Sequence, residues 1–381
     1  MSANSAARTP LSCTYEGYRQ TRFFSSLDGL RCLSILAVVW SHAGVPIPGV
    51  RITLQGHLGV ELFFAISGFL ITTLLLRERE ESGRISLAAF YARRSLRIFP
   101  LYYTIVVLYV VVVFALERKT ASGQNFFSNL PYFLTYTSNW FVPLDGRVIF
   151  YFAWSLATEE QFYLVWPTVE KLLRGWRPVA LVIALLILRS AVAAAVSSGQ
   201  LPRDHLGVIA ILSINPALLG GVIMAHALHD RRTFELVQYV LGAKWAAPLM
   251  LIVLLLATQL ADSLGWVWIS MVLVVGAVVI SESNGLGAVL RWRPIAHIGL
   301  VSYGVYLMHM LSYNAMKQLL PIFGITNPHA LFPATVIAAT FAATVSYWYY
   351  ESFFLRLKRA YARSSTRHPT AAEPIKSTPP T

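Results

Sequence analysis

The chain has 381 residues, of which 56% are hydrophobic and only 13% are charged, and its formal net charge is +13. About a quarter of the residues in soluble domains are charged, so this composition excludes an ordinary soluble protein and predicts an all-α polytopic membrane protein. The positive charge does not indicate nucleic-acid binding, because no soluble basic face is present. Cys13 and Cys32 have no spacing that suits a disulfide framework or a zinc site, so we expect no metal.

Ten apolar runs follow one another along the chain, each near the length that crosses a bilayer as a helix. They cover residues 28–46, 57–76, 99–116, 151–170, 178–197, 206–228, 245–261, 264–281, 296–316 and 330–352. We therefore expect about ten transmembrane helices, with a kink in the sixth at Asn215-Pro216. The expected organisation is a cytoplasmic amino-terminal segment over 1–23, a membrane domain over 24–355 and a disordered basic cytoplasmic tail over 356–381.

Basic residues are concentrated in alternate segments between these runs. Lys and Arg are frequent before the first run, between the second and third and after the last, whereas the intervening segments hold few. Because cytoplasmic loops carry the excess of Lys and Arg, this alternation predicts that both termini are cytoplasmic. The high net charge is then mainly a consequence of topology.

The first run, LDGLRCLSILAVVWSHAG at 27–44, holds Arg31 near one end and His42 near the other. Eleven residues of α-helix return to within about 20° of the same face, roughly 16 Å further along the axis, so both side chains project from one side. This placement favours a shared polar path through the bundle interior. The alternatives are a flanking charge at Arg31 and an interfacial residue at His42.

The second run begins with GHLGVELFFAISGFL, which combines a carboxylate with small residues. Glu61 is a candidate ion-pair partner of Arg31 or hydrogen-bond partner of His42. Gly59 and Gly68 allow close helix packing, and Ser67 is able to bond across helices. Ordinary membrane packing is the alternative interpretation of these small residues.

Three arginines, Arg93, Arg94 and Arg97, precede the third run in FYARRSLRIFPLYY. Arg94 and Arg97 are three positions apart and are therefore neighbours on a helix. Topology explains their presence, and so does attraction to anionic lipid, worth about 1 kcal/mol per charge. Guanidinium groups also bind phosphate in bidentate fashion, which makes the cluster a candidate site for a phosphorylated ligand.

Two adjacent carboxylates interrupt the fourth run, in WSLATEEQFYLVWP. Glu159 and Glu160 must point to different faces of a helix, so at least one of them faces the bundle interior or water. Carboxylates inside the membrane are functional candidates by default.

The ninth run contains SYGVYLMH, in which three polar side chains recur at helical spacing. Ser302, Tyr306 and His309 lie at i, i+4 and i+7 and so share one face. A satisfied structural network of hydroxyl groups is the alternative to a functional site here.

Taken in order, these stretches resemble the membrane acyltransferase-3 family over about residues 24–355. The family's Arg-x10-His element falls on Arg31 and His42, and the acidic position of its Trp-Ser-Leu-x-x-Glu-Glu-x-Phe-Tyr element falls on Glu159. GVELFFAISGFL, RRSLRIFPLYY, SYGVYLMH and SYWYYESFF are similar to its other elements. Each motif is weak alone, but their common order is specific. The last element departs from the family's Glu-x-Pro pattern, because Ser352 and Phe353 follow Glu351.

The resemblance implies an enzyme of the bacterial inner membrane that moves an acyl group from acyl-CoA, with acetyl-CoA as the expected donor, to a hydroxyl of a cell-surface or lipid-linked carbohydrate. It implies that Arg94 and Arg97, with Arg31 and Arg93, hold the phosphates of cytoplasmic CoA. The implied partners are therefore this donor, an alcohol acceptor and the lipid bilayer, without nucleic acid or metal.

The resemblance also implies roles in the chemistry itself. His42 acts as the general base on the acceptor hydroxyl or accepts the acyl group, and Glu61 or Glu159 orients its imidazole. Ser67 or Tyr306 polarises the thioester carbonyl. The alternatives are acylation of a small metabolite such as a macrolide, a transporter or flippase of a glycan or lipid, and a membrane protein with no substrate.

Overall fold

The computed structural model describes residues 14–260 and 264–357, and all regular secondary structure within them is helical. Most of the predicted segments 1–23 and 356–381 lies outside the described residues. The elements are α1 (Tyr15–Gln20), α2 (Ser25–Ala43), η1 (Arg51–Leu54), α3 (His57–Ser82), α4 (Leu87–Leu116), α5 (Ala121–Leu134), α6 (Ser138–Phe141), α7 (Ala153–Leu172), α8 (Arg177–Ser197), α9 (Leu206–Leu212), α10 (Pro216–His229), α11 (Arg231–Leu241), α12 (Ala246–Leu260), α13 (Leu264–Ile280), α14 (Gly287–Leu290), α15 (Arg293–Leu300), α16 (Ser302–Ile322), η2 (Pro328–Ala330), α17 (Leu331–Ser346) and the π-helical η3 (Tyr347–Glu351).

Several of these helices have the length and apolar composition of membrane spans. In the described part of the chain, α3, α4, α8 and the stretch Pro328–Leu357 that contains α17 each qualify alone. Three bent pairs, α9–α10, α11–α12 and α15–α16, raise the number of candidate spans from four to as many as seven. This is the all-α architecture of a membrane protein, while ten spans with both termini cytoplasmic stay a prediction.

The break in the sixth apolar run was predicted correctly. Helices α9 and α10 meet at an angle of 46°. The Asn215 side chain accepts a hydrogen bond from the Leu218 N–H at 3.0 Å and so caps α10, and Pro216 occupies the first turn of that helix. Proline cannot continue a helix that comes before it but fits the start of a new one, which explains why the chain bends here.

The ninth apolar run, predicted over 296–316, is wrong at its start. Its first residues belong to α15, which meets α16 at an angle of 80°. A side-chain carbon on Gly299 would collide with the carbonyl group of Asp28 in α2, so this glycine lets α15 lie across α2 at close range. Packing against α2 thus separates α15 from the straight helix α16.

Close contact between helices at the centre of the fold depends on glycine, as the sequence predicted. A side-chain carbon on Gly59 would meet the Ser34 carbonyl of α2, and one on Gly68 would meet the Leu218 carbonyl of α10. Gly221 of α10 makes the reciprocal approach to α3. Small residues of this kind let neighbouring backbones pack closely in a membrane bundle.

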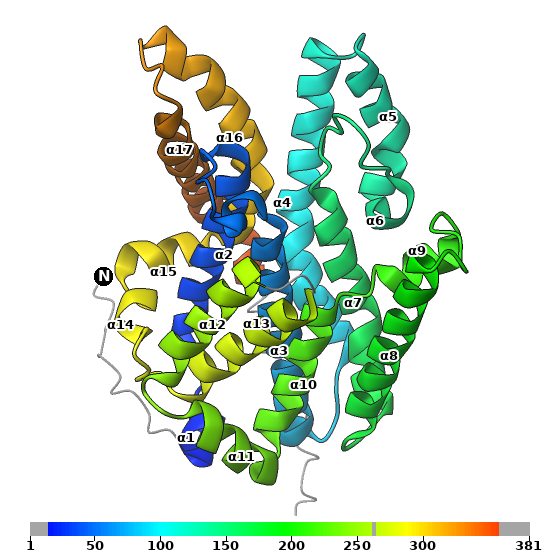
Figure 1. The fold of residues 1–381 in the computed structure, drawn as a ribbon, viewed down its shortest axis with the longest axis vertical. Helices are drawn as coiled ribbons and strands as arrows, with labels where there is room; N and C mark the ends of the chain where they lie inside the picture. Colours follow the sequence, from blue (N-terminus) through cyan, green and yellow to red (C-terminus); the bar gives the residue numbers. More distant parts are fainter. Residues whose placement is uncertain (1–13, 261–263, 358–381) are drawn as a thin grey trace, which may run out of the picture.

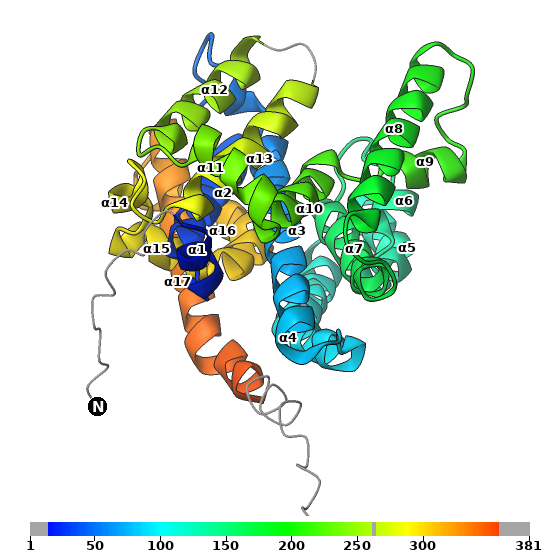
Figure 2. The same ribbon diagram turned by 90° about the horizontal axis from the view of Figure 1, so that it is seen from below.

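The helix pairs α4–α5 and α16–α17 project from the same end of the molecule, and α1 and α11 lie at the opposite end (Figure 1). Seen from below, α8 and α9 lie on one side of the bundle, away from α12 and α14 (Figure 2). Helices α2, α3, α4, α7 and α16 surround the interior space that holds most of the polar residues singled out above.

Candidate active site

A cavity of about 310 Å³ lies among α2, α3, α4, α7 and α16. We call it the arginine cavity. The residues that the sequence had singled out and that line it are Arg31, Ser67, Arg94, Arg97, Glu159, Glu160, Ser302 and Tyr306. Apolar side chains of α2 and α3, such as Leu27 and Phe63, complete the wall. The structure therefore brings residues from five separate helices to one space.

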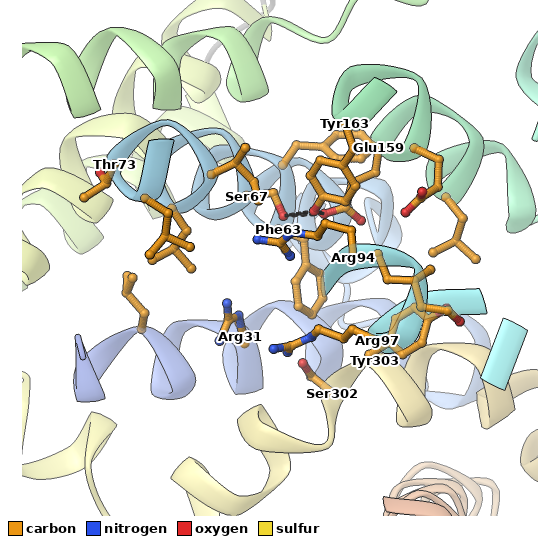
Figure 3. A pocket seen from close by; sticks show the side chains of 18 of the residues that line it. Arg31, Phe63, Ser67, Thr73, Arg94, Arg97, Glu159, Tyr163, Ser302 and Tyr303 are labelled. Atoms are coloured by element: carbon orange, nitrogen blue, oxygen red, sulfur yellow. Dashed lines mark hydrogen bonds between the residues drawn. The ribbon is translucent and has the colours of Figure 1, made fainter. Parts of the chain in front are cut away.

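Three guanidinium groups define the character of this cavity. Helix α4 begins twelve residues before the apolar run because Ser86 caps it, accepting a hydrogen bond from the Ala89 N–H at 3.4 Å. Arg94 and Arg97 consequently lie on the first turns of a helix, and their side chains point into the cavity together with Arg31 from α2 (Figure 3). Such a concentration of fixed positive charge favours a polyanionic ligand.

Two of these arginines are held in place by neighbours. Arg31 donates a hydrogen bond to Asp28, one turn earlier on α2, at 2.8 Å. The guanidinium of Arg94 lies over the ring of Tyr163 at 5.0 Å and over that of Phe90 at 5.8 Å. Cation–π contacts fix the plane of an arginine without using its N–H donors, which stay available for a ligand.

On the opposite wall, α3 and α7 contribute a small hydrogen-bonded group. The Glu159 carboxylate accepts hydrogen bonds from the hydroxyls of both Ser67 and Tyr163 (Figure 3). Tyr163 also donates to Ser67 at 3.3 Å. Glu160 borders the cavity as well, so the prediction that at least one of the two carboxylates faces the interior is confirmed.

A second polar group, the histidine cluster, consists of His42, Tyr151, Tyr306 and His309. The Tyr151 hydroxyl lies 2.7 Å from Nε2 of His42, and the rings of His42 and His309 are 5.4 Å apart. His309 is fully buried, and its Nδ1 donates to the carbonyl of Tyr306. A carbonyl only accepts, so Nδ1 of His309 carries a proton.

Tyr306 connects this cluster to the arginine cavity. Its ring packs on His309 with centroids 5.5 Å apart, and its hydroxyl lies 2.6 Å from Ser155, which also lines the cavity. His42 itself does not line the cavity. Arg31 and His42 therefore belong to one helix, as expected, but to two adjoining groups of residues.

Glu61 and Arg93 lie elsewhere. Glu61 accepts a hydrogen bond from Asn215 of α10 at 2.7 Å and borders a second cavity, because the neighbouring position Val60 takes the face of α3 towards the arginine cavity. The expected contact of Glu61 with Arg31 or His42 is corrected accordingly. Arg93 pairs with Glu78 at 2.8 Å and does not line the arginine cavity.

Sequence reasoning missed two tyrosines that matter here. Tyr151, not a carboxylate, is the described residue that hydrogen-bonds to His42. It precedes α7 in an irregular segment, where helical spacing gives no signal. Tyr163 was detectable, since it lies four positions after Glu159 and such residues are neighbours on a helix.

The sequence comparison defines the class of protein to which this geometry belongs. Residues 24–348 match the family model described as an acyltransferase domain, and they include every residue of the arginine cavity and the histidine cluster except Arg22 and Phe23. The chain belongs to this acyltransferase-3 family.

The curated relatives are bacterial proteins. YrhL of Bacillus subtilis, provisionally named a peptidoglycan O-acetyltransferase, is 29% identical over 369 residues, which is 88% of this chain and 56% of its own length. The peptidoglycan O-acetyltransferase OatA of Listeria monocytogenes is 26% identical over 354 residues, 84% of this chain and 54% of its own. A provisionally named O-acetyltransferase of Staphylococcus aureus is 28% identical over 323 residues, 77% of this chain and 51% of its own.

The chain thus spans about half the length of the curated relatives it matches. No solved structure matches it significantly. Family membership therefore rests on the sequence, and the geometry above adds where the family's motifs meet in space.

Proposed function

We propose that this protein transfers an acetyl group from acetyl-CoA, bound from the cytoplasm, to a hydroxyl group of a cell-surface carbohydrate. The observation that carries the proposal is the convergence of Arg31, Arg94 and Arg97 on one cavity. The donor would carry its charge in phosphate groups, and guanidinium groups bind phosphate in bidentate fashion.

The place of the arginines supports a cytoplasmic donor. With the amino terminus inside, Arg94 and Arg97 at the start of α4 lie in the inner half of the membrane, and so does Arg31 near the start of α2. Arg22 and Arg77 line the same cavity and extend the positive charge further towards the cytoplasm. A cavity of about 310 Å³ is at the lower limit for ligand pockets, which suits the acyl-phosphopantetheine arm with its phosphate rather than the whole donor.

In the reaction, His42 takes the proton of the acceptor hydroxyl while that oxygen attacks the thioester carbon. The carbon–sulfur bond breaks, and the thiolate of CoA leaves and takes the proton from the imidazolium. Tyr151 positions the ring of His42 by the 2.7 Å hydrogen bond. Ser67 and Tyr163 both donate to Glu159, so this group positions α3 against α7 and does not polarise the carbonyl.

Support for a glycan acceptor comes from two of the relatives above, whose names specify O-acetylation of peptidoglycan. We propose a glycan of the cell envelope, modified by a multi-pass protein of the bacterial inner membrane. The same residues in a transporter would move a substrate without consuming a thioester.

The test is turnover by the purified full chain in liposomes with radiolabelled acetyl-CoA outside and an oligosaccharide acceptor. Release of CoA together with labelled oligosaccharide is the expected result. Movement of unmodified oligosaccharide across the bilayer with no CoA release would replace the proposal by a transporter.

A further inference from the structure

A second cavity, of about 270 Å³, lies on the other side of α3 and α7 from the arginine cavity. The two share a wall: Phe64 lines the arginine cavity, Trp154 lines the second one, and their rings pack edge to face at 6.2 Å. We call the second space the acceptor cavity. Its wall also includes Glu61, Arg189 and Trp268.

The charge of the acceptor cavity differs from that of the arginine cavity. Its described lining contains one carboxylate, Glu61, and one guanidinium, Arg189, which attract each other. Positive and negative charge therefore balance, so the cavity offers no advantage to a phosphorylated ligand. A neutral ligand fits this wall.

The wall also supplies both hydrogen-bond donors and acceptors. Among the described residues, Arg189 Nε and Ser138 Oγ are buried donors with no hydrogen-bond partner in the protein, and Trp268 Nε1 lies close to the Glu61 carboxylate without normal hydrogen-bond geometry. Buried polar atoms are nearly always partnered, so two unpartnered donors around one cavity indicate a ligand that accepts hydrogen bonds. The carboxylate of Glu61, already an acceptor for Asn215, lies beside them. Hydroxyl groups both donate and accept and so match this mixture.

The backbone that borders the acceptor cavity is partly irregular. The break between α9 and α10, at Ser213 to Asn215, lines it. Irregular backbone at membrane depth is tolerated where it borders a polar cavity, and broken helices often mark binding sites there. Trp154 and Trp268 add aromatic faces, which are apolar surfaces with a polar edge.

From these observations we propose that this cavity binds the saccharide acceptor, through hydroxyl contacts to Ser138, Arg189 and Trp268. That the bound saccharide is the acceptor rests on the proposed function, whereas saccharide binding itself can be measured without turnover. The predicted topology places this cavity on the side of a cell-surface saccharide. In that topology α3, α7 and α13 all start at the external face. The cavity residues Glu61, Trp154 and Trp268 then lie in the outer half of the membrane.

The experiment measures equilibrium binding of tetra-N-acetylchitotetraose to the full chain in a detergent without a sugar head group. Trp268→Phe keeps an aromatic ring, smaller than the indole, and removes the N–H donor. Its matched control is Trp266→Phe on the same helix, at a residue that is 65% exposed and does not line the cavity. Ser138→Ala removes a second donor independently.

We expect Trp268→Phe and Ser138→Ala each to weaken binding about tenfold or more, and Trp266→Phe to bind as the wild type does. Unchanged binding in both cavity variants, or no binding of the saccharide to the wild type, would overturn the inference. Equilibrium binding of acetyl-CoA in the same preparations separates the two proposals, since it tests the donor site and does not need the saccharide.

Discussion

The arginine cavity and the histidine cluster meet at Tyr306 yet differ in charge and in packing. The cavity is open, lined by several helices and dominated by the charges of Arg31, Arg94 and Arg97. The cluster is compact and built from rings in contact, with His309 fully buried. The difference separates two tasks: the charged cavity suits the holding of an anionic donor, and the cluster suits the movement of a proton.

The largest effect is expected at the histidine cluster. His42→Ala removes the proposed general base, so transfer of the acetyl group should fall by about 10²–10⁴-fold. The measurement is the rate of label transfer from acetyl-CoA by purified protein. His329→Ala, at an exposed position in η2, is the matched control and should keep the wild-type rate. Wild-type transfer by His42→Ala would remove the proposed role.

A smaller effect is expected at the arginine cavity. Arg94→Gln and Arg97→Gln each remove charge-assisted hydrogen bonds worth about 1.5–3 kcal/mol, so KM for acetyl-CoA should rise roughly tenfold to hundredfold. Arg118→Gln, an exposed arginine just after the other end of α4, is the control. If KM is the same in all three variants, the cavity does not hold the donor.

Tyr151→Phe tests the histidine cluster separately from the arginine cavity, because it removes one hydrogen bond from His42 and no charge. A net hydrogen bond contributes about 1 kcal/mol, so kcat should fall about fivefold to tenfold while KM for acetyl-CoA stays constant. Tyr239→Phe, 88% exposed, controls for the loss of a tyrosine hydroxyl. An equal change in KM would mean that Tyr151 acts on the donor side.

The smallest effect on kcat is expected at the ion pair of Arg147, which lies four residues before Tyr151. Arg147 makes two hydrogen bonds to Glu117 at the end of α4, at 2.7 and 2.8 Å, and these hydrogen bonds raise the pKa of Arg147. The Arg147 side chain is 64% exposed and that of Glu117 is 28% exposed, so the pair contributes no more than about 1 kcal/mol. Glu117→Gln should lower kcat less than Tyr151→Phe does, and the loss should shrink further in high salt, where the wild-type pair is screened.

Features that depend on local sequence were predictable. The helical breaks and close contacts at Asn215-Pro216, Gly59 and Gly68 follow from residue type alone, because proline and glycine act on their own backbone. The expectation that Ser67 bonds across helices is confirmed by its contact with Glu159, and so is the expectation that Glu159 or Glu160 faces the interior.

Features that depend on distant contacts were not predictable. Tyr151 meets His42 across 109 positions of sequence, and Glu61 meets Asn215 across 154. A single sequence carries no record of such pairs. The bend before α16 has the same origin, since it reflects the packing of α15 on α2.

Binding of acetyl-CoA to the His42→Ala protein, measured at equilibrium beside Arg97→Gln, tests the separation of donor binding and proton transfer most directly. The account predicts wild-type affinity in His42→Ala and at least tenfold weaker binding in Arg97→Gln. Loss of donor binding in His42→Ala, with full binding in Arg97→Gln, would contradict it and place the donor at the histidine cluster.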